Sequence, residues 1–180
     1  MEKLFLTHTV SNPAFKIGIG QSTFKMRQGS FKIKEKVLKE TVLRQFIVNK
    51  VEPEEISITL QEHHEKLELS IQINNKRLEL IPKVSQPNIN RLKIKLYATP
   101  EENIYGCGSR FSEFNLRGKR IPIWVEDATP ILRQGKHIYF PQSLFLSISS
   151  DKYFCFIDTT SYLEFDFTNQ NQHNVYVWGI

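Results

Sequence analysis

Apolar and polar residues alternate with a period of two along most of this chain, and this pattern constrains the fold more than any other feature. Every second residue is apolar in "KLELSIQI" and again in "RLELIPKV", and the polar residues "NNK" separate the two stretches. Side chains of a β-strand point to opposite faces in turn, so this period indicates strands with one buried face. The two stretches therefore predict a β-hairpin over residues 66–84 that turns at the Asn-Asn pair.

Further strands are expected along the rest of the chain, with turn residues between them. Strands at 55–62 and 90–98 would extend the hairpin into a meander. The other expected strands cover 3–9, 14–18, 22–36 with a kink near Gly29, 40–49, 104–110, 137–149, 153–158, 162–168 and 172–179. The stretch "KEKVLKETVLRQF" is compatible with a helix, but it also fits two strands joined around Lys39. The sequence predicts an all-β protein, a two-sheet antiparallel β-sandwich forming a single domain over residues 1–180.

The composition is that of an ordinary globular protein, with 40% apolar and 24% charged residues. A chain of 180 residues can bury a core without disulfides or a metal. Cys107 and Cys155 lie in apolar, strand-like segments and are expected to be buried free thiols. The apolar run in the opening "MEKLFLTHTV" is too short for a signal peptide. No apolar stretch of the sequence is long enough to span a bilayer. We expect a cytoplasmic protein with no membrane partner.

Positive charge is concentrated in the first fifty residues, which carry ten of the Lys and Arg residues and three acids, within a net charge of +5. Such a segment can be a nucleic-acid or anion-binding face, or the solvated face of a sheet. Lys32, Lys34 and Lys36 fall at every second position, as do Lys93 and Lys95, and apolar residues alternate with them. This spacing favours a solvated sheet face, and an anion-binding or nucleic-acid-binding β domain remains an alternative.

Motifs for cofactors and metals are weak. The Gly-x-Gly of "GIGQS" at 18–22 has no third glycine and no helix to bind a phosphate, so a strand turn is expected there. His63 and His64 are neighbours and would point to opposite faces of a strand, with no third ligand nearby. No Gly-x-Ser-x-Gly, Cys-x-x-Cys or His-x-x-x-His occurs. We therefore expect no metal and no cofactor.

The stretch "ENIYGCGSRFSEFNLRGKRIPIWVED" ends on an aromatic residue and two acids, Trp124, Glu126 and Asp127. Proteins bind sugars by stacking a ring on their C–H faces while carboxylates accept hydroxyl groups, and glycoside hydrolysis needs two carboxylates about 5–9 Å apart. A core tryptophan with surface acids explains the same residues, since adjacent acids on a strand point apart. Asp158 and Asp166 are expected to cap turns at strand ends.

The segment "IYGCGSRFSEFNLRGKRIPIWVED" followed by "YFPQSLFLSISSDKYFCFIDTTSYLEFDF" resembles the N-terminal β-sandwich domain of glycoside hydrolase family 31, the α-glucosidases and their relatives. Together with "LTHTVSNPAFKIGIGQSTFKMRQGSFKIKEKV", it is most similar to the bacterial sulfoquinovosidase branch. The resemblance covers nearly the whole chain and is strongest over 104–127 and 139–167. It implies a galactose-mutarotase-like sandwich.

The resemblance also implies an intracellular retaining α-glycosidase in which this sandwich packs on a catalytic (β/α)₈ barrel that is C-terminal to it. The aspartate nucleophile and acid/base belong to that barrel, so no catalytic residue is assigned here and the chain alone is expected to be inactive. Substrate contacts in the pocket wall are implied for Arg117, Trp124, Glu126 and Asp127.

The partners implied are the catalytic barrel and an α-glycoside. A barrel-facing apolar patch is expected to make the isolated chain self-associate. The alternative is a free-standing carbohydrate-binding module that uses Trp124 and the neighbouring acids.

Overall fold

The computed structural model describes residues 6–27, 30–74, 77–108, 114–124, 144–148 and 152–179. Every regular element within them is a β-strand, and no helix long and apolar enough to cross a membrane occurs in these residues. The strands are β1 (Phe15–Arg27), β2 (Ser30–Leu43), β3 (Gln45–Val51), β4 (Glu55–Glu62), β5 (Glu65–Asn74), β6 (Arg77–Val84), β7 (Arg91–Tyr97), β8 (Asn103–Gly106), β9 (Arg120–Ile123), β10 (Leu144–Ile148), β11 (Tyr153–Phe156), β12 (Tyr162–Asp166) and β13 (Gln172–Trp178).

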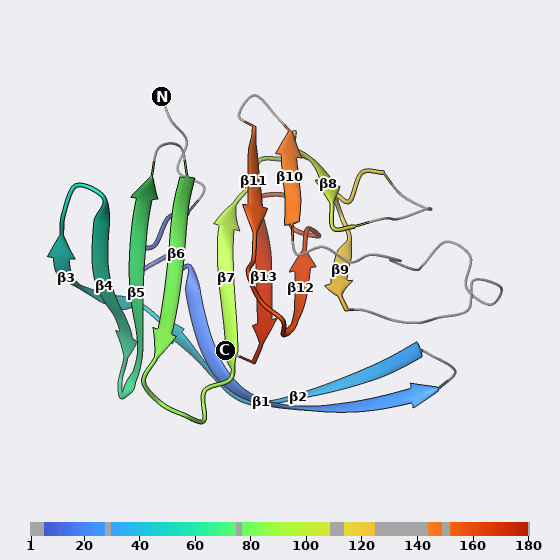
Figure 1. Cartoon of the computed structure of the whole chain (residues 1–180), viewed down its shortest axis with the longest axis horizontal. Helices are drawn as coiled ribbons and strands as arrows, with labels where there is room; N and C mark the ends of the chain where they lie inside the picture. The colour runs from blue at the N-terminus through green and yellow to red at the C-terminus, as the bar shows by residue number, and fades with distance from the viewer. Residues whose placement is uncertain are drawn as a thin grey trace.

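The strands form two layers of antiparallel sheet, and this confirms the predicted all-β sandwich. One layer is a six-stranded sheet in the order β2-β1-β7-β13-β12-β9. The other layer is divided between a four-stranded sheet, β3-β4-β5-β6, and a three-stranded sheet, β11-β10-β8. In Figure 1 the three-stranded sheet lies over β13 and β12, while the four-stranded sheet lies over the first half of β1 and the second half of β2.

The core lies between the layers and is built from the alternating apolar residues. Phe145 of β10 packs edge-to-face against Phe165 and Phe167, with ring centroids 5.1 and 5.0 Å apart. Strand β7 shows the period clearly, because Leu92, Ile94 and Leu96 are buried while the lysines between them are half-buried. The buried apolar side chains of all three sheets form one continuous cluster.

The predicted meander is correct for β4, β5 and β6 but wrong for its last strand. Strand β7 pairs with β1 and β13 in the opposite layer, not with β6. The connection is fixed at Asn90, whose side-chain amide bonds both the N–H and the carbonyl of Gly20, at 2.9 and 3.2 Å. The Asn90 backbone bonds Gly18 and Gly179, which belong to the paths of β1 and β13. These polar contacts hold β7 in the far layer.

Strands β1 and β2 form one long hairpin where strands were predicted at 14–18, 22–36 and 40–49, and the last of these is divided between β2 and β3. Strand β7 pairs with β1 only from Phe15 to Gly18. Residues 21–27 and 30–36, here called the arm, therefore pair only with each other and pass beyond the lower ends of β12 and β9 in Figure 1. The expected turn at 18–22 is an irregularity in register between Ile19 and Gly20.

Other boundaries also differ from the expectation. Residues 6–9 are irregular although a strand was predicted at 3–9, and β8 ends at Gly106, before the end of the strand predicted at 104–110. Within the strand predicted at 137–149, only residues 144–148 are described, and they form β10. Strand β9 was not predicted, because it has four residues and one of them is Pro122. Cys107 and His63 have φ values of 60° and 54°, so both lie in turns and not on strands. The predicted kink at Gly29 lies outside the described residues.

Candidate functional site

Arg117 lies in the loop between β8 and β9 and connects three loops through its guanidinium group. Nη2 donates to the carbonyl of Thr99 at 2.8 Å and to the carbonyl of Gln170 at 2.6 Å. Within the same loop, the Arg117 backbone N–H donates to Oδ1 of Asn115 at 3.1 Å. Since this guanidinium nitrogen is occupied by backbone carbonyls, the contacts observed for Arg117 are those of a residue that positions loops.

Trp124 follows β9 directly and is the second ring in a row of four aromatic rings. Its ring stacks on Phe24 of the arm, with centroids 5.6 Å apart and planes 17° apart. On its other side Trp124 contacts Tyr162 at 5.7 Å, and Tyr162 contacts Trp178 at 4.2 Å. These four rings, here called the aromatic ladder, run across the outer side of the six-stranded sheet at the end where the arm leaves it. The ladder holds the arm against the sandwich.

A polar network fixes the base of the arm beside this ladder. Arg91 forms a bidentate pair with Glu35, in which Nε donates to Oε1 at 2.8 Å and Nη2 donates to Oε2 at 3.1 Å. Ser22 joins the network by accepting from Arg91 Nη2 at 2.8 Å and donating to Glu35 at 2.6 Å. The Arg91 guanidinium also lies 5.4 Å from the centroid of the Trp178 ring. Bidentate, largely shielded pairs of this kind are stronger than exposed ones.

The structure describes two of the four predicted substrate contacts and places them at opposite ends of β9. Arg120, on the Arg117 side, pairs with Asp166, whereas Ile123, next to Trp124, pairs with Leu163. At about 3.3 Å per residue, this strand alone separates the two positions by roughly 10 Å. Glu126 and Asp127 lie outside the described residues. The described part of the site therefore consists of the aromatic ladder and not of one compact cluster.

A buried polar pair near Arg117 was not predicted from the sequence. Nε2 of His173 lies 2.8 Å from Oε2 of Glu102, and the two side chains are 0% and 5% exposed. Burial lowers the pKa of His173, while the hydrogen bond to Glu102 opposes that shift. Oε1 of Glu102 also accepts the N–H of Thr99 at 3.1 Å. The pair is enclosed and cannot contact a substrate, and it serves the same turn that Arg117 holds.

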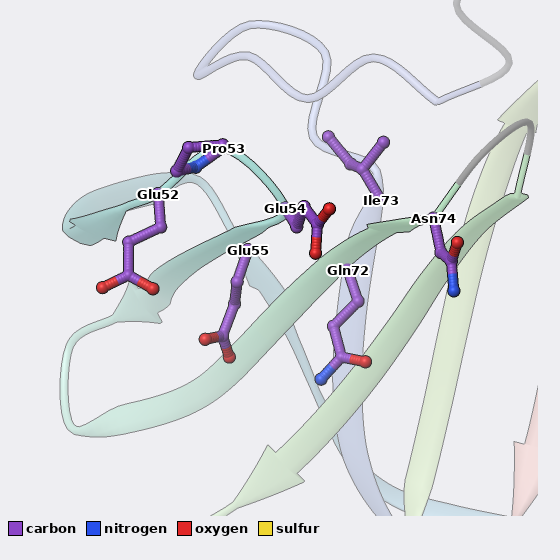
Figure 2. A pocket seen from close by; sticks show the side chains of 7 residues that line it. All are labelled: Glu52, Pro53, Glu54, Glu55, Gln72, Ile73 and Asn74. Carbon is purple, nitrogen blue, oxygen red and sulfur yellow. The ribbon is translucent and has the colours of Figure 1, made fainter.

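A shallow hollow of about 570 Å³ lies where β4 begins. It is lined by Glu52, Pro53, Glu54, Glu55, Gln72, Ile73 and Asn74 (Figure 2). Lys50 lies 3.0 Å from a carboxylate oxygen of Glu52 and 3.3 Å from one of Glu55. None of the described residues that line the hollow is aromatic. Among the described residues no group of three or more His, Cys, Asp or Glu could hold a metal ion.

Comparison with known proteins identifies the class to which this sandwich belongs. Residues 8–166 match the family described as the glycosyl hydrolase 31 N-terminal galactose mutarotase-like domain. The match covers most of the chain, and the chain belongs to this family.

Two curated relatives and one solved structure similar to this chain are sulfoquinovosidases. The chain is 30% identical to the sulfoquinovosidase of Escherichia coli K12 and 29% identical to that of Agrobacterium fabrum C58, over 98% and 99% of its own length. A solved structure of a GH31 sulfoquinovosidase from E. rectale, in complex with an aza-sugar inhibitor, superimposes with a TM-score of 0.80 at 27% identity over 96% of this chain. The chain spans only 28% of the length of each of these relatives, which continue into a catalytic domain.

Proposed function

We propose that this chain acts as the non-catalytic N-terminal domain of a family 31 α-glycoside hydrolase of the α-glucosidase or sulfoquinovosidase type. In this role it supports the catalytic barrel, and Trp124, Glu126 and Asp127 contribute part of the wall of the sugar pocket. The observation that carries the proposal is the match in fold and sequence to 28% of the length of sulfoquinovosidases, together with the match to the family's N-terminal domain. Arg117 contributes by holding the loop that precedes β9.

The surroundings of Glu102, Asp166 and Glu55 support a non-catalytic role. A retaining glycosidase needs a nucleophile and a general acid whose pKa is raised. Glu102 and Asp166 are buried and bound to His173 and Arg120. In the hollow, hydrogen bonds from Ser70 and Lys50 lower the pKa of Glu55, which is the wrong direction for a general acid. We assign the acids that break the glycosidic bond to the catalytic domain, as the family resemblance implies.

The surroundings of Trp124 favour a supporting domain over a free-standing carbohydrate-binding module. A binding module needs an open ring face on which the sugar can stack. Phe24 stacks on the Trp124 ring and Tyr162 contacts it from another direction. The ring is therefore committed to holding the arm, and any contact with sugar would use what remains exposed at its rim.

Two assays on the isolated chain test the proposal. We expect no release of nitrophenol above background from nitrophenyl α-glucoside or nitrophenyl α-sulfoquinovoside. We expect no binding heat from α-glucosides in isothermal titration at millimolar concentration. Turnover would contradict the non-catalytic role, and saturable binding that Trp124→Ala abolishes would support the module instead.

A further inference from the structure

The outer faces of the three sheets differ in chemistry. On the six-stranded sheet, the residues that pair side by side across the outer face are Val42, Lys16, Lys93, Tyr176, Glu164 and Pro122. On the four-stranded sheet, the outer residues are Ser57, Thr59, Gln61, Lys66, Glu68, Ser70, Gln72, Glu79 and Lys83, with Ile47 and Ile81 as the apolar members. Both faces mix charged and polar residues with a few apolar ones, as expected of an antiparallel sheet with one face in water.

The three-stranded sheet departs from this rule, because it is apolar on both faces. Its inner face carries Phe145, which is fully buried. Across its outer face Leu144 pairs with Phe156, and Leu146 pairs with Phe154 on one side and with Tyr105 on the other. Leu146, Ile148, Phe154 and Phe156 are 42%, 42%, 61% and 52% exposed. We use the name β8–β10–β11 face for the six outer residues Tyr105, Leu144, Leu146, Ile148, Phe154 and Phe156.

The β8–β10–β11 face is extended by one further ring and lacks charge. Phe114, 85% exposed, packs on Tyr105 with centroids 4.7 Å apart. None of the residues that define the face is charged, in contrast to the lysines and glutamates of the other two outer faces. A contiguous apolar surface of this kind marks an interface with another folded unit, and depletion of charge is typical of the centre of such an interface.

We propose that the β8–β10–β11 face is the surface on which the catalytic domain of the enzyme packs. This inference rests on the proposed function and assigns the contact to one side of the sandwich. The relatives supply the occupant, since 72% of their length lies beyond the 28% that this chain spans and includes a catalytic domain. A sheet that is apolar on both faces needs cover on both. The six-stranded sheet covers the inner face of the three-stranded sheet, and the catalytic domain covers the outer face.

A charge substitution on this face tests the inference. The parent chain, the double variant Leu146→Glu with Phe154→Glu, and the control Ile47→Glu with Ile81→Glu are each produced together with the part of the E. coli sulfoquinovosidase that the chain does not match. The control residues also lie on an outer face and are 50% and 43% exposed, against 42% and 61% for the tested pair. Binding is measured by co-purification and isothermal titration, and folding by the melting temperature of each free chain.

We expect the parent and control chains to bind equally within threefold, and the face variant to bind at least a hundredfold more weakly with an unchanged melting temperature. If the glutamates lower the melting temperature, Leu146→Asn with Phe154→Asn replaces them. Equal binding by the face variant, or loss of binding by the control alone, would overturn the assignment of the face and leave the proposed function standing. Absence of binding by the parent would refute the proposed function and the inference with it. A face variant that converts a parent dimer to a monomer but still binds the catalytic part would show that a second copy occupies the face.

Discussion

Nε2 of His173 and Oε2 of Glu102 meet at 2.8 Å inside the sandwich and connect β13 to the turn that precedes β8. The ring of His173 also packs edge-to-face on Phe167, with centroids 5.1 Å apart. A neutral imidazole that donates from Nε2 satisfies the carboxylate without bringing a second charge into the core. The end of the sandwich that holds Arg117 therefore depends on the protonation state of one histidine.

The first prediction concerns pH. Burial lowers the pKa of His173 below its ordinary value of 6.5. Just below pH 6.5, the His173 side chain is therefore protonated more in the unfolded chain than in the native chain. The contribution of His173 to the free energy of unfolding is complete above pH about 6.5 and falls as pH decreases below it. Urea denaturation at several pH values should show the difference between the wild type and His173→Gln shrinking from pH 7.5 to pH 5. His8 titrates in the same direction, so the series is repeated in a His8→Gln background. A difference independent of pH would refute this account.

The second prediction separates loop positioning from sugar contact at Arg117. Charged donors to carbonyls contribute about 1.5–3 kcal/mol each, and Arg117→Met loses two such bonds. We expect the free energy of unfolding of the isolated chain to fall by roughly 2–3 kcal/mol, less than the sum of two such bonds because the bond to Gln170 is exposed to water. Arg117→Lys should lower it by less, because one bond can be kept. If Arg117→Met left stability unchanged and weakened only substrate binding in the assembled enzyme, Arg117 would be a sugar contact, as the family resemblance implies.

The third prediction concerns the aromatic ladder. Trp124→Ala removes the ring that stacks on Phe24, and aromatic pairs contribute about 0.5–1.5 kcal/mol beyond the area they bury. Amide hydrogen exchange in the arm should accelerate by about tenfold or more, while Trp124→Phe should largely preserve protection. Phe114→Ala, a truncation of an 85% exposed ring elsewhere, is the matched control. Unchanged exchange in the arm of Trp124→Ala would show that the ladder does not hold it.

The fourth prediction concerns the thiols. Both cysteines are free, Cys107 is buried, and burial raises the pKa of Cys155 to about 12. Since the thiolate is the reactive form, a disulfide reagent such as DTNB at pH 8 should label the native chain slowly and both thiols rapidly after denaturation. Fast labelling of one thiol in the native chain would mean that it is accessible and ionised.

Local alternation was enough to predict most strands and the class of fold. The stretches that became β4, β5, β6 and β7 each have a clear period of two, and their bounds differ by only a residue or two from those expected. What alternation could not provide was the partner of each strand. Strand β7 satisfies the same local pattern in a meander as it does between β1 and β13, and only the distant contacts of Asn90 decide between them.

The sequence says less about the candidate site, for a related reason. A family signature indicates which segments matter, but it does not show which side chains face inward. Trp124 and Arg117 were grouped because the family resemblance implies that both lie in the pocket wall, yet a whole strand lies between them. The pair of Glu102 and His173 joins residues 71 apart, so no motif could have marked it.

The most direct test of the account is whether this chain restores hydrolysis to a catalytic domain that lacks its own sandwich. The part of the E. coli sulfoquinovosidase that the chain does not match is produced alone and together with this chain, and hydrolysis of nitrophenyl α-sulfoquinovoside is measured for each. The account predicts no activity from either part alone and measurable turnover from the two together, reduced by Leu146→Glu with Phe154→Glu. Activity of this chain by itself, or a soluble and folded catalytic part whose rate the chain does not change, would contradict it.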